Sequence, residues 1–275
     1  MYKGLKYILM SFLSVSLLYG VWLLIRICVM DCFIIPTGSM RPALGPGNKV
    51  VVNKLLMGPR IYKDLHFVPT GQELVSWRLK GLRAPRHNDI VVFNFPHHNN
   101  KISFIINNVY CKRIVGIPGD SISIIDGHYR NNNYDRVLGD EKEQMRLEHM
   151  PDSMLWQFSF VTFPFDERFA WTIRDFGPMY IPRKGSIMKI TPYEATLYKM
   201  LLEWETGQPI EYDWESDSVW AGEKRLCHHQ WQHNYYFMAG DNVLDSNDSR
   251  YWGLVPEEYI VGIVKHIIKK KKDEI

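Results

Sequence analysis

The chain has 275 residues, which is enough to bury a substantial core and predicts two lobes. Its hydrophobic share of 46% and charged share of 23% exclude an intrinsically disordered chain. A formal net charge of only +3 excludes a nucleic-acid surface built on overall basicity. The four cysteines include no C-x-x-C pair, so we predict no metal site, and nothing in the sequence predicts a cofactor.

An apolar run near the amino terminus is the first element. From Tyr7 to Ile25 no charged residue occurs, about the length that crosses a hydrocarbon core as a helix. A cleavable signal is the competing interpretation, because Lys3 and Lys6 precede the run. However, the run exceeds the roughly 7–15 residues of a signal's apolar region, and Ala43 is the first alanine. We therefore predict an uncleaved anchor with a cytoplasmic amino terminus.

Beyond the anchor the sequence is β-rich. Short β-branched runs bounded by turn residues predict strands at Lys49–Val52, Asp89–Phe95, Ser121–Ile125 and Tyr259–Val264. Thr191–Glu205 is the best helix candidate, with Pro192 near its start. Periodicity that would indicate βαβ units is missing, so the sequence predicts a mainly β fold.

We divide the chain into four parts. Residues 1–30 form the cytoplasmic tip and anchor, and residues 31–126 together with 236–268 form the core domain. Residues 127–235, rich in Trp, Tyr, Met and charges, form an inserted second domain. Residues 269–275 are a basic tail, interpreted as solvated, with contact to anionic lipid as the alternative. The stretch from 55 to 86 carries no motif that we can assign.

The segment from Ile35 to Pro42 contains a serine in an unusual setting. Pro36 rigidifies the chain before Ser39, and Gly38 permits unusual dihedral angles. Such a segment can hold a hydroxyl and a backbone N–H in fixed geometry, as an oxyanion hole requires. An ordinary turn serine is the alternative. No G-x-S-x-G elbow occurs, so an α/β-hydrolase has no support.

A lysine lies in the apolar, strand-like stretch from Tyr110 to Asp120. A snorkelling side chain is the ordinary interpretation of Lys112. A lysine that acts as a base must be neutral, which requires its pKa to fall from about 10.4 towards about 7–8. Burial against apolar neighbours lowers a lysine pKa, and the residues around Lys112 are apolar enough to bury it.

The segment from Gly240 to Gly253 is rich in acidic and hydroxyl residues. It lacks the EF-hand calcium pattern, and no second acidic motif completes an aspartic dyad. As a scaffold for a base, it offers an ion pair between Asp248 and Arg250, with Ser246 as a hydrogen-bond partner for a neutral amine. This last interpretation uses most of the segment.

Three other clusters receive no role. Ser186–Lys189 matches S-x-x-K, but Gly185 before it and Thr191-Pro192 after it favour a short strand. Residues three apart on a strand point to opposite faces, so this serine and lysine would not meet. Cys227-His228-His229 and His97-His98 lack spaced partners and are weak metal signals.

Together these segments resemble the bacterial type I signal peptidases, membrane-bound Ser-Lys endopeptidases that release exported proteins from their signal peptides. Four segments carry the resemblance, in family order behind an anchor and over roughly half the chain. Ile35–Leu44 is similar to the nucleophile box, and Lys49–Lys54 to the strand box that follows it. Tyr110–Asp120 is similar to the lysine box, and Gly240–Gly253 to the acidic-serine box.

The resemblance implies roles for individual residues. Ser39 would be the nucleophile and Lys112 the general base, while the backbone N–H of Ser39 and the hydroxyl of Thr37 would stabilise the oxyanion. Ser246 would orient the lysine, and Asp248 and Arg250 would brace the site. Ile35 and Cys111 would line the pockets for small substrate side chains.

The resemblance also implies a fold, a location and a substrate. The fold would be a transmembrane helix, then a β-barrel-like catalytic core with an inserted β-rich domain. The chain would cross the bacterial cytoplasmic membrane once, with its amino terminus inside and the catalytic domain outside. It would cleave exported preproteins after a small residue. Departures from the family pattern are Thr37 for serine, Asn48 for aspartate and Asn88 for glycine, which put local turn geometry in doubt.

Two other classes of function remain open from the sequence. The first is a membrane-tethered binding or assembly factor on this fold, which predicts a charged, solvent-exposed Lys112. The second is a Ser-His-Asp hydrolase. Ten histidines make it conceivable, but none lies in a motif.

Overall fold

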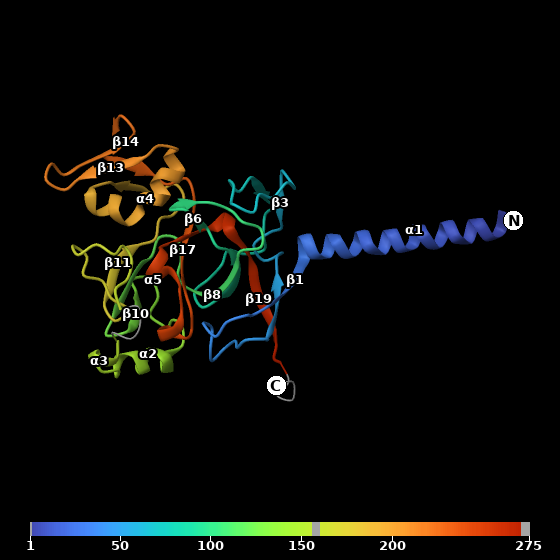
Figure 1. Cartoon of the computed structure of the whole chain (residues 1–275), viewed down its shortest axis with the longest axis horizontal. Coiled ribbons are helices and arrows are strands. Elements are labelled where there is room, and N and C mark those ends of the chain that lie inside the picture. Colours follow the sequence, from blue (N-terminus) through green and yellow to red (C-terminus); the bar gives the residue numbers. More distant parts are fainter. Residues whose placement is uncertain (1, 156–159, 271–275) are drawn as a thin grey trace.

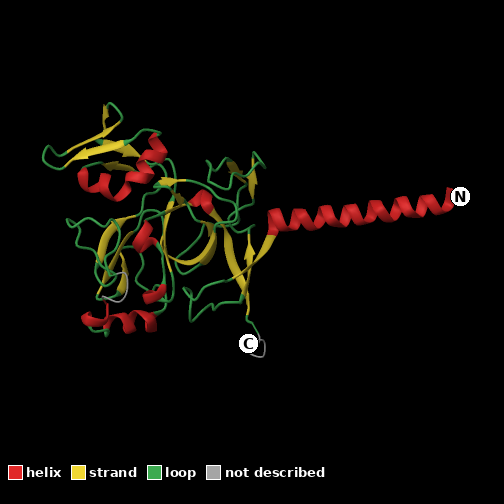
Figure 2. Cartoon of the chain, viewed as in Figure 1, coloured by secondary structure: helices red, strands yellow, loops and turns green. Residues whose placement is uncertain are grey.

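The structure, a computed structural model, describes residues 2–155 and 160–270, and it is a strand-rich body with one projecting helix (Figures 1 and 2). Helix α1 (Tyr2–Leu24) continues into the π-helical turn η1 (Ile25–Val29). Within them, Gly4–Val29 is apolar and long enough to cross a membrane by length and composition. The predicted mainly β fold behind an apolar amino-terminal helix is confirmed. Part of the predicted basic tail, residues 271–275, lies outside the described residues.

A curled, seven-stranded antiparallel sheet forms the barrel-like core of the body. Its order is β1 (Met30–Ile34), β2 (Lys49–Asn53), β19 (Ile260–Ile268), β5 (Ile90–Asn94), β8 (Val109–Gly116), β17 (Tyr235–Ala239) and β18 (Val255–Pro256). In β2 the alternate side chains of Val50 and Val52 are buried, as the period of a strand dictates. All five residues of β17 are buried, so both faces of this strand are covered.

Smaller sheets surround this core. A three-stranded sheet has the order β10 (His128–Asn131), β9 (Ser121–Ile125), β11 (Phe176–Tyr180), and another contains β13 (Ile210–Asp213), β14 (Ser218–Ala221) and β15 (Lys224–Arg225). The two-stranded pairs are β3 (Arg60–Tyr62) with β4 (Ser76–Arg78), β6 (His97–His98) with β7 (Lys101–Ile102), and β12 (Ile187–Lys189) with β16 (His228–Gln230). All four predicted strands are present, as β2, β5, β9 and β19.

Short helices cover the sheets: α2 (Glu141–Glu148), α3 (Asp152–Leu155), α4 (Pro192–Thr206), α5 (Ser249–Trp252) and the 3-10 turns η2 (Val243–Asp245) and η3 (Glu257–Tyr259). The predicted helix is α4, which begins with a capping box of Thr191 and Glu194. Helix α2 was not predicted, although Asp140 caps it by accepting from the backbone N–H of Glu143.

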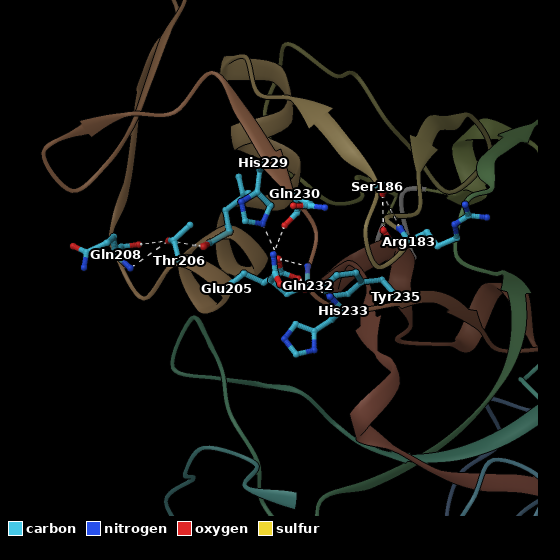
Figure 3. Close-up of polar contacts among 11 residues, drawn as sticks. Arg183, Ser186, Glu205, Thr206, Gln208, His229, Gln230, Gln232, His233 and Tyr235 are labelled. Atoms are coloured by element: carbon cyan, nitrogen blue, oxygen red, sulfur yellow. Dashed lines mark hydrogen bonds and ion pairs between the residues drawn. The ribbon is translucent and has the colours of Figure 1, made fainter. Parts of the chain in front are cut away.

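A buried carboxylate ties α4 to the chain that leads into β17 (Figure 3). Glu205 accepts hydrogen bonds from the Tyr235 hydroxyl (2.6 Å), His229 Nε2 (2.6 Å) and the backbone N–H of Gln232 (2.9 Å). Burial favours the neutral acid, but these donors hold the pKa of Glu205 below its ordinary value. The carboxylate therefore fixes the approach to β17, which pairs with the lysine-bearing strand β8.

One hydrophobic cluster joins the seven-stranded sheet to the segment 127–235. Ile114 and Phe237 of the sheet belong to the same cluster as Phe176, Ile181 and Leu202. The division into domains stays a prediction.

Candidate active site

Ser39 lies in the turn between β1 and β2, and the acidic-serine segment holds that turn. The backbone N–H of Asn242 donates to the Ser39 carbonyl oxygen (3.1 Å), and its side-chain amide donates to that of Gly38 (3.2 Å). Within the turn, the N–H of Arg41 donates to the Gly38 oxygen (2.9 Å). The serine is thus positioned by residues two hundred positions away in the sequence.

Lys112 brings three of the four predicted boxes together, those of the nucleophile, the lysine and the acidic-serine loop. Its Nζ, from β8, lies 2.7 Å from Oγ of Ser39 and 3.0 Å from Oγ of Ser246. Lys112 is only 3% exposed to solvent. The solvent-exposed lysine expected for a non-enzymatic tethered factor is therefore not found, and snorkelling is wrong for this side chain.

The environment of Lys112 favours the neutral amine. Burial lowers the pKa of Lys112, and the positive charge of Arg250 adds to that effect. The Asp248 carboxylate opposes it, because a nearby anion stabilises the ammonium form. Burial is the largest of these contributions, so the neutral amine, which can accept a proton, forms at lower pH than in a free lysine.

The predicted ion pair between Asp248 and Arg250 is present and fully buried. Asp248 accepts from Nε (2.9 Å) and Nη2 (2.8 Å) of Arg250 and from the backbone N–H of Gly240 (2.9 Å). Burial alone would lower the pKa of Arg250, but the adjacent carboxylate raises it above its ordinary value. The contact between Gly240 and Asp248 spans Ser246 and closes this part of the segment into a loop.

A second ion pair was missed by the sequence reasoning. Arg113, the neighbour of Lys112 on β8, makes two hydrogen bonds of 2.6 Å to the buried carboxylate of Asp241. Such a two-pronged contact fixes direction as well as distance. It ties the lysine strand to the start of the acidic-serine loop. The available signal was an arginine in an apolar strand, which requires an acidic partner when it is buried.

The predicted oxyanion donors lie next to the serine. Thr37 Oγ1 is 3.5 Å from Ser39 Oγ. Among the residues that the structure describes, none accepts a hydrogen bond from the backbone N–H of Ser39, so this donor is available to a ligand. Ile35 and Cys111 belong to one small apolar cluster with Met40, the residue after the serine. Whether they line substrate pockets stays a prediction.

Two departures from the family pattern have local explanations. Asn88 has a φ of 66°, in the left-handed region that glycine and asparagine tolerate best. Its side chain also donates to the carbonyl of Val137 (2.8 Å) and accepts from the N–H of Gly139 (2.9 Å). Asn48 accepts from the N–H of Gly45 (3.0 Å). Both asparagines therefore support their turns.

A histidine-based site finds no support in the described part of the chain. There, no histidine hydrogen-bonds to a serine hydroxyl: His229 meets Glu205, His233 meets Glu258 and His87 meets Asp120. The S-x-x-K serine is structural, since Ser186 donates its hydroxyl to the carbonyl of Arg183 (Figure 3), and it precedes the predicted strand β12. Among the described residues no cluster of His, Cys, Asp or Glu could hold a metal ion.

Comparison with known proteins identifies the family. Residues 6–269 match the profile described as "Signal peptidase, peptidase S26", so the chain belongs to that family. It is 27% identical over 253 residues to signal peptidase I of Pseudomonas aeruginosa, covering 87% of this chain and 65% of that protein. It is 25% identical over 282 residues to signal peptidase I of Buchnera aphidicola subsp. Baizongia pistaciae, covering 98% and 80%.

The chain thus spans just under two thirds of the length of the Pseudomonas relative. A solved signal peptidase I from Enterococcus faecalis is 18% identical, with 67% of this chain and 100% of that chain covered. Its TM-score is 0.32, too low to support an argument about the fold.

Proposed function

We propose that this chain is a membrane-anchored serine endopeptidase that cleaves signal peptides from exported preproteins after a small residue. Ser39 is the nucleophile and Lys112 the general base. The single observation that carries the proposal is the 2.7 Å contact between Lys112 Nζ and Ser39 Oγ, with the lysine buried. Family membership supports the same activity.

The chemistry runs in two halves. Ser39 Oγ attacks the carbonyl carbon of the scissile bond while its proton passes to the neutral amine of Lys112. The resulting oxyanion is stabilised by the N–H of Ser39 and the hydroxyl of Thr37. The Lys112 ammonium then gives the proton to the leaving amine as the C–N bond breaks. In the second half Lys112 takes a proton from water as the water oxygen attacks the ester carbonyl carbon. The Lys112 ammonium then returns the proton to Ser39 Oγ as the ester C–O bond breaks, which releases the cleaved signal peptide and regenerates Ser39.

Supporting residues hold the base in position. Ser246 Oγ accepts a hydrogen bond from Lys112 Nζ (3.0 Å), which leaves the lone pair of the neutral amine to face Ser39. The Asp248–Arg250 pair and the Arg113–Asp241 pair act through the loop that carries Ser246. A neutral serine beside the amine leaves its pKa low, whereas a carboxylate there would raise it.

The apolar helix supports placement in the bacterial cytoplasmic membrane. Gly4–Val29 would cross once, with the amino terminus inside, since Lys6 lies at that end. The catalytic residues then lie outside, close to the membrane surface, because Ser39 follows the helix by only ten residues. A signal peptide held in the same bilayer would present its cleavage site at that level.

The test is cleavage of a purified preprotein in detergent by the wild type, Ser39→Ala and Lys112→Ala. We expect the wild type to cut after a small residue and both variants to lose activity, with thermal unfolding unchanged enough to exclude misfolding. The matched control is Lys49→Ala, an exposed lysine on β2 that makes no catalytic contact. Normal cleavage by Lys112→Ala would disprove the lysine assignment.

A further inference from the structure

A cavity of about 760 Å³ lies where the apolar helix meets the body, and neither Ser39 nor Lys112 lines it. Its walls come from the end of α1, from η1 and β1, from β3 and the segment after it, and from the start of β8. Figure 1 shows β3 beside the base of α1. Most of its lining side chains are apolar, among them Leu23, Ile27, Phe33, Ile61, Leu65 and Phe67.

The charged groups of this cavity are predominantly positive. Arg26, Lys54, Arg60 and Lys63 face a single carboxylate, Asp31. That carboxylate is shared by two of them, with contacts of 2.6 Å to Arg26 and 3.3 Å to Lys54. The wall therefore carries an excess of three positive charges.

The remaining two cations have no carboxylate partner within the described chain. Arg60 donates to neutral acceptors, the Tyr62 hydroxyl (2.6 Å) and Asn94 Oδ1 (2.6 Å). Lys63 is exposed. Burial lowers the pKa of Lys54, and the Asp31 carboxylate opposes this shift only in part. The charges of Arg60 and Arg26 are smaller contributions that also lower it, so keeping Lys54 charged has a free-energy cost. An anion bound here would relieve that cost.

The height of the cavity relative to the bilayer follows from the helix. Its 26 residues measure about 39 Å at 1.5 Å per residue, more than the roughly 30 Å of a hydrocarbon core. The surplus is about six residues. Leu23, Arg26 and Ile27, which line the cavity, lie in the last seven residues of the helix. If α1 spans as in the proposed function, the cavity opens at the headgroup layer opposite the amino terminus.

We propose that this cavity binds one anionic phospholipid of that leaflet, with its phosphate beside Lys54 and Lys63 and an acyl chain along the apolar wall. Positive walls match an anionic headgroup. The same 55–86 segment exposes Leu65 (77%) and Leu82 (79%), apolar surface suited to neighbouring acyl chains. The segment to which the sequence assigned no motif thus becomes a lipid-contact element.

The test measures lipid retention by native mass spectrometry on the full chain in detergent, using the Ser39→Ala form throughout. Phosphatidylglycerol and phosphatidylcholine with identical acyl chains are the probes. We expect a single tightly held phosphatidylglycerol and about tenfold weaker retention in Lys54→Gln/Lys63→Gln, since each basic group near an anionic surface contributes measurably. The matched control is Lys142→Gln/Lys224→Gln, which removes two exposed lysines elsewhere and is expected to retain lipid normally.

Three results would overturn the proposal. The first is that the Lys54→Gln/Lys63→Gln variant retains phosphatidylglycerol as well as the parent chain does. The second is that the parent chain retains phosphatidylcholine as well as phosphatidylglycerol. The third is displacement of the lipid by millimolar glycerol phosphate, which would indicate a free-phosphate site. The single variant Lys63→Gln changes only an exposed side chain, so weaker lipid retention by this variant is not explained by a folding defect that replacing Lys54 could cause. Because binding is read on a chain without its nucleophile, it is independent of cleavage. If the wild-type chain retains the lipid but does not cleave preprotein, only the proposed function is refuted.

Discussion

A Cβ atom placed on Gly240 would lie 2.1 Å from Oγ of Ser246 and 2.4 Å from the carbonyl oxygen of Ser39. Real Cβ atoms do not approach heavy atoms so closely, so only glycine fits between these two serines. The N–H of the same glycine donates to Asp248 (2.9 Å). Gly240 is therefore one point at which the nucleophile turn and the acidic-serine loop come into direct contact.

We expect Gly240→Ala to lower kcat/KM by about a hundredfold, because displacing positioned groups by about 1 Å has effects of that size. The measurement is preprotein cleavage at matched concentrations of folded enzyme. Gly45→Ala is the control, since its nearest neighbour would be Arg41 Nε at 4.0 Å and its activity is expected to stay near the wild-type value. Equal activity of the two variants would contradict the close contact.

The pH dependence of cleavage should report on Lys112. The base acts only when neutral, so kcat/KM rises as pH rises through its pKa. Burial lowers that pKa, so we expect the midpoint of the rise to lie below the pKa of about 10.4 of a free lysine. The measurement is a kcat/KM profile with a peptide substrate that carries no titrating group. A rise centred near pH 10.4 would mean that the lysine is solvated during catalysis.

Removing one charge of the buried ion pair should destabilise the fold. Asp248→Asn leaves the fully buried Arg250 without its anion, and breaking such a pair costs about 3–5 kcal/mol. Chemical unfolding in detergent measures the loss. Asp166→Asn is the matched control, because its partner Arg168 is mostly exposed and surface pairs contribute about 1 kcal/mol or less. Similar losses for both variants would argue against a buried pair.

Helix α2 should support the acidic-serine loop. Leu147 of α2 is fully buried in a cluster with Val243 and Leu244, which precede Ser246. Leu147→Ala leaves a cavity there, and we expect a loss of about 2–5 kcal/mol in stability. We also expect reduced kcat at temperatures where the variant remains folded. Met145→Ala on the exposed face of α2 should change stability by about 0.5 kcal/mol or less.

Local patterns in the sequence were enough to predict local structure. Short β-branched runs bounded by turn residues predicted β2 and β19, and the signals at Thr191 and Pro192 predicted α4, because neighbouring residues determine backbone preferences. The Asp248–Arg250 pair was predictable for the same reason, since the partners are two residues apart. The nucleophile and base came from a resemblance over four boxes. Nothing in the spacing of Ser39 and Lys112 could establish their contact.

Only the tertiary structure decided what environment the lysine has. Lys112 meets Ser39 across 73 residues and Ser246 across 134, and Arg113 meets Asp241 across 128. A lysine pKa depends on desolvation by every segment packed around it, and that packing is a property of the fold and not of adjacent residues. The cationic cavity at the base of α1 was hidden for the same reason. Its charges come from segments that have no pattern in common along the chain.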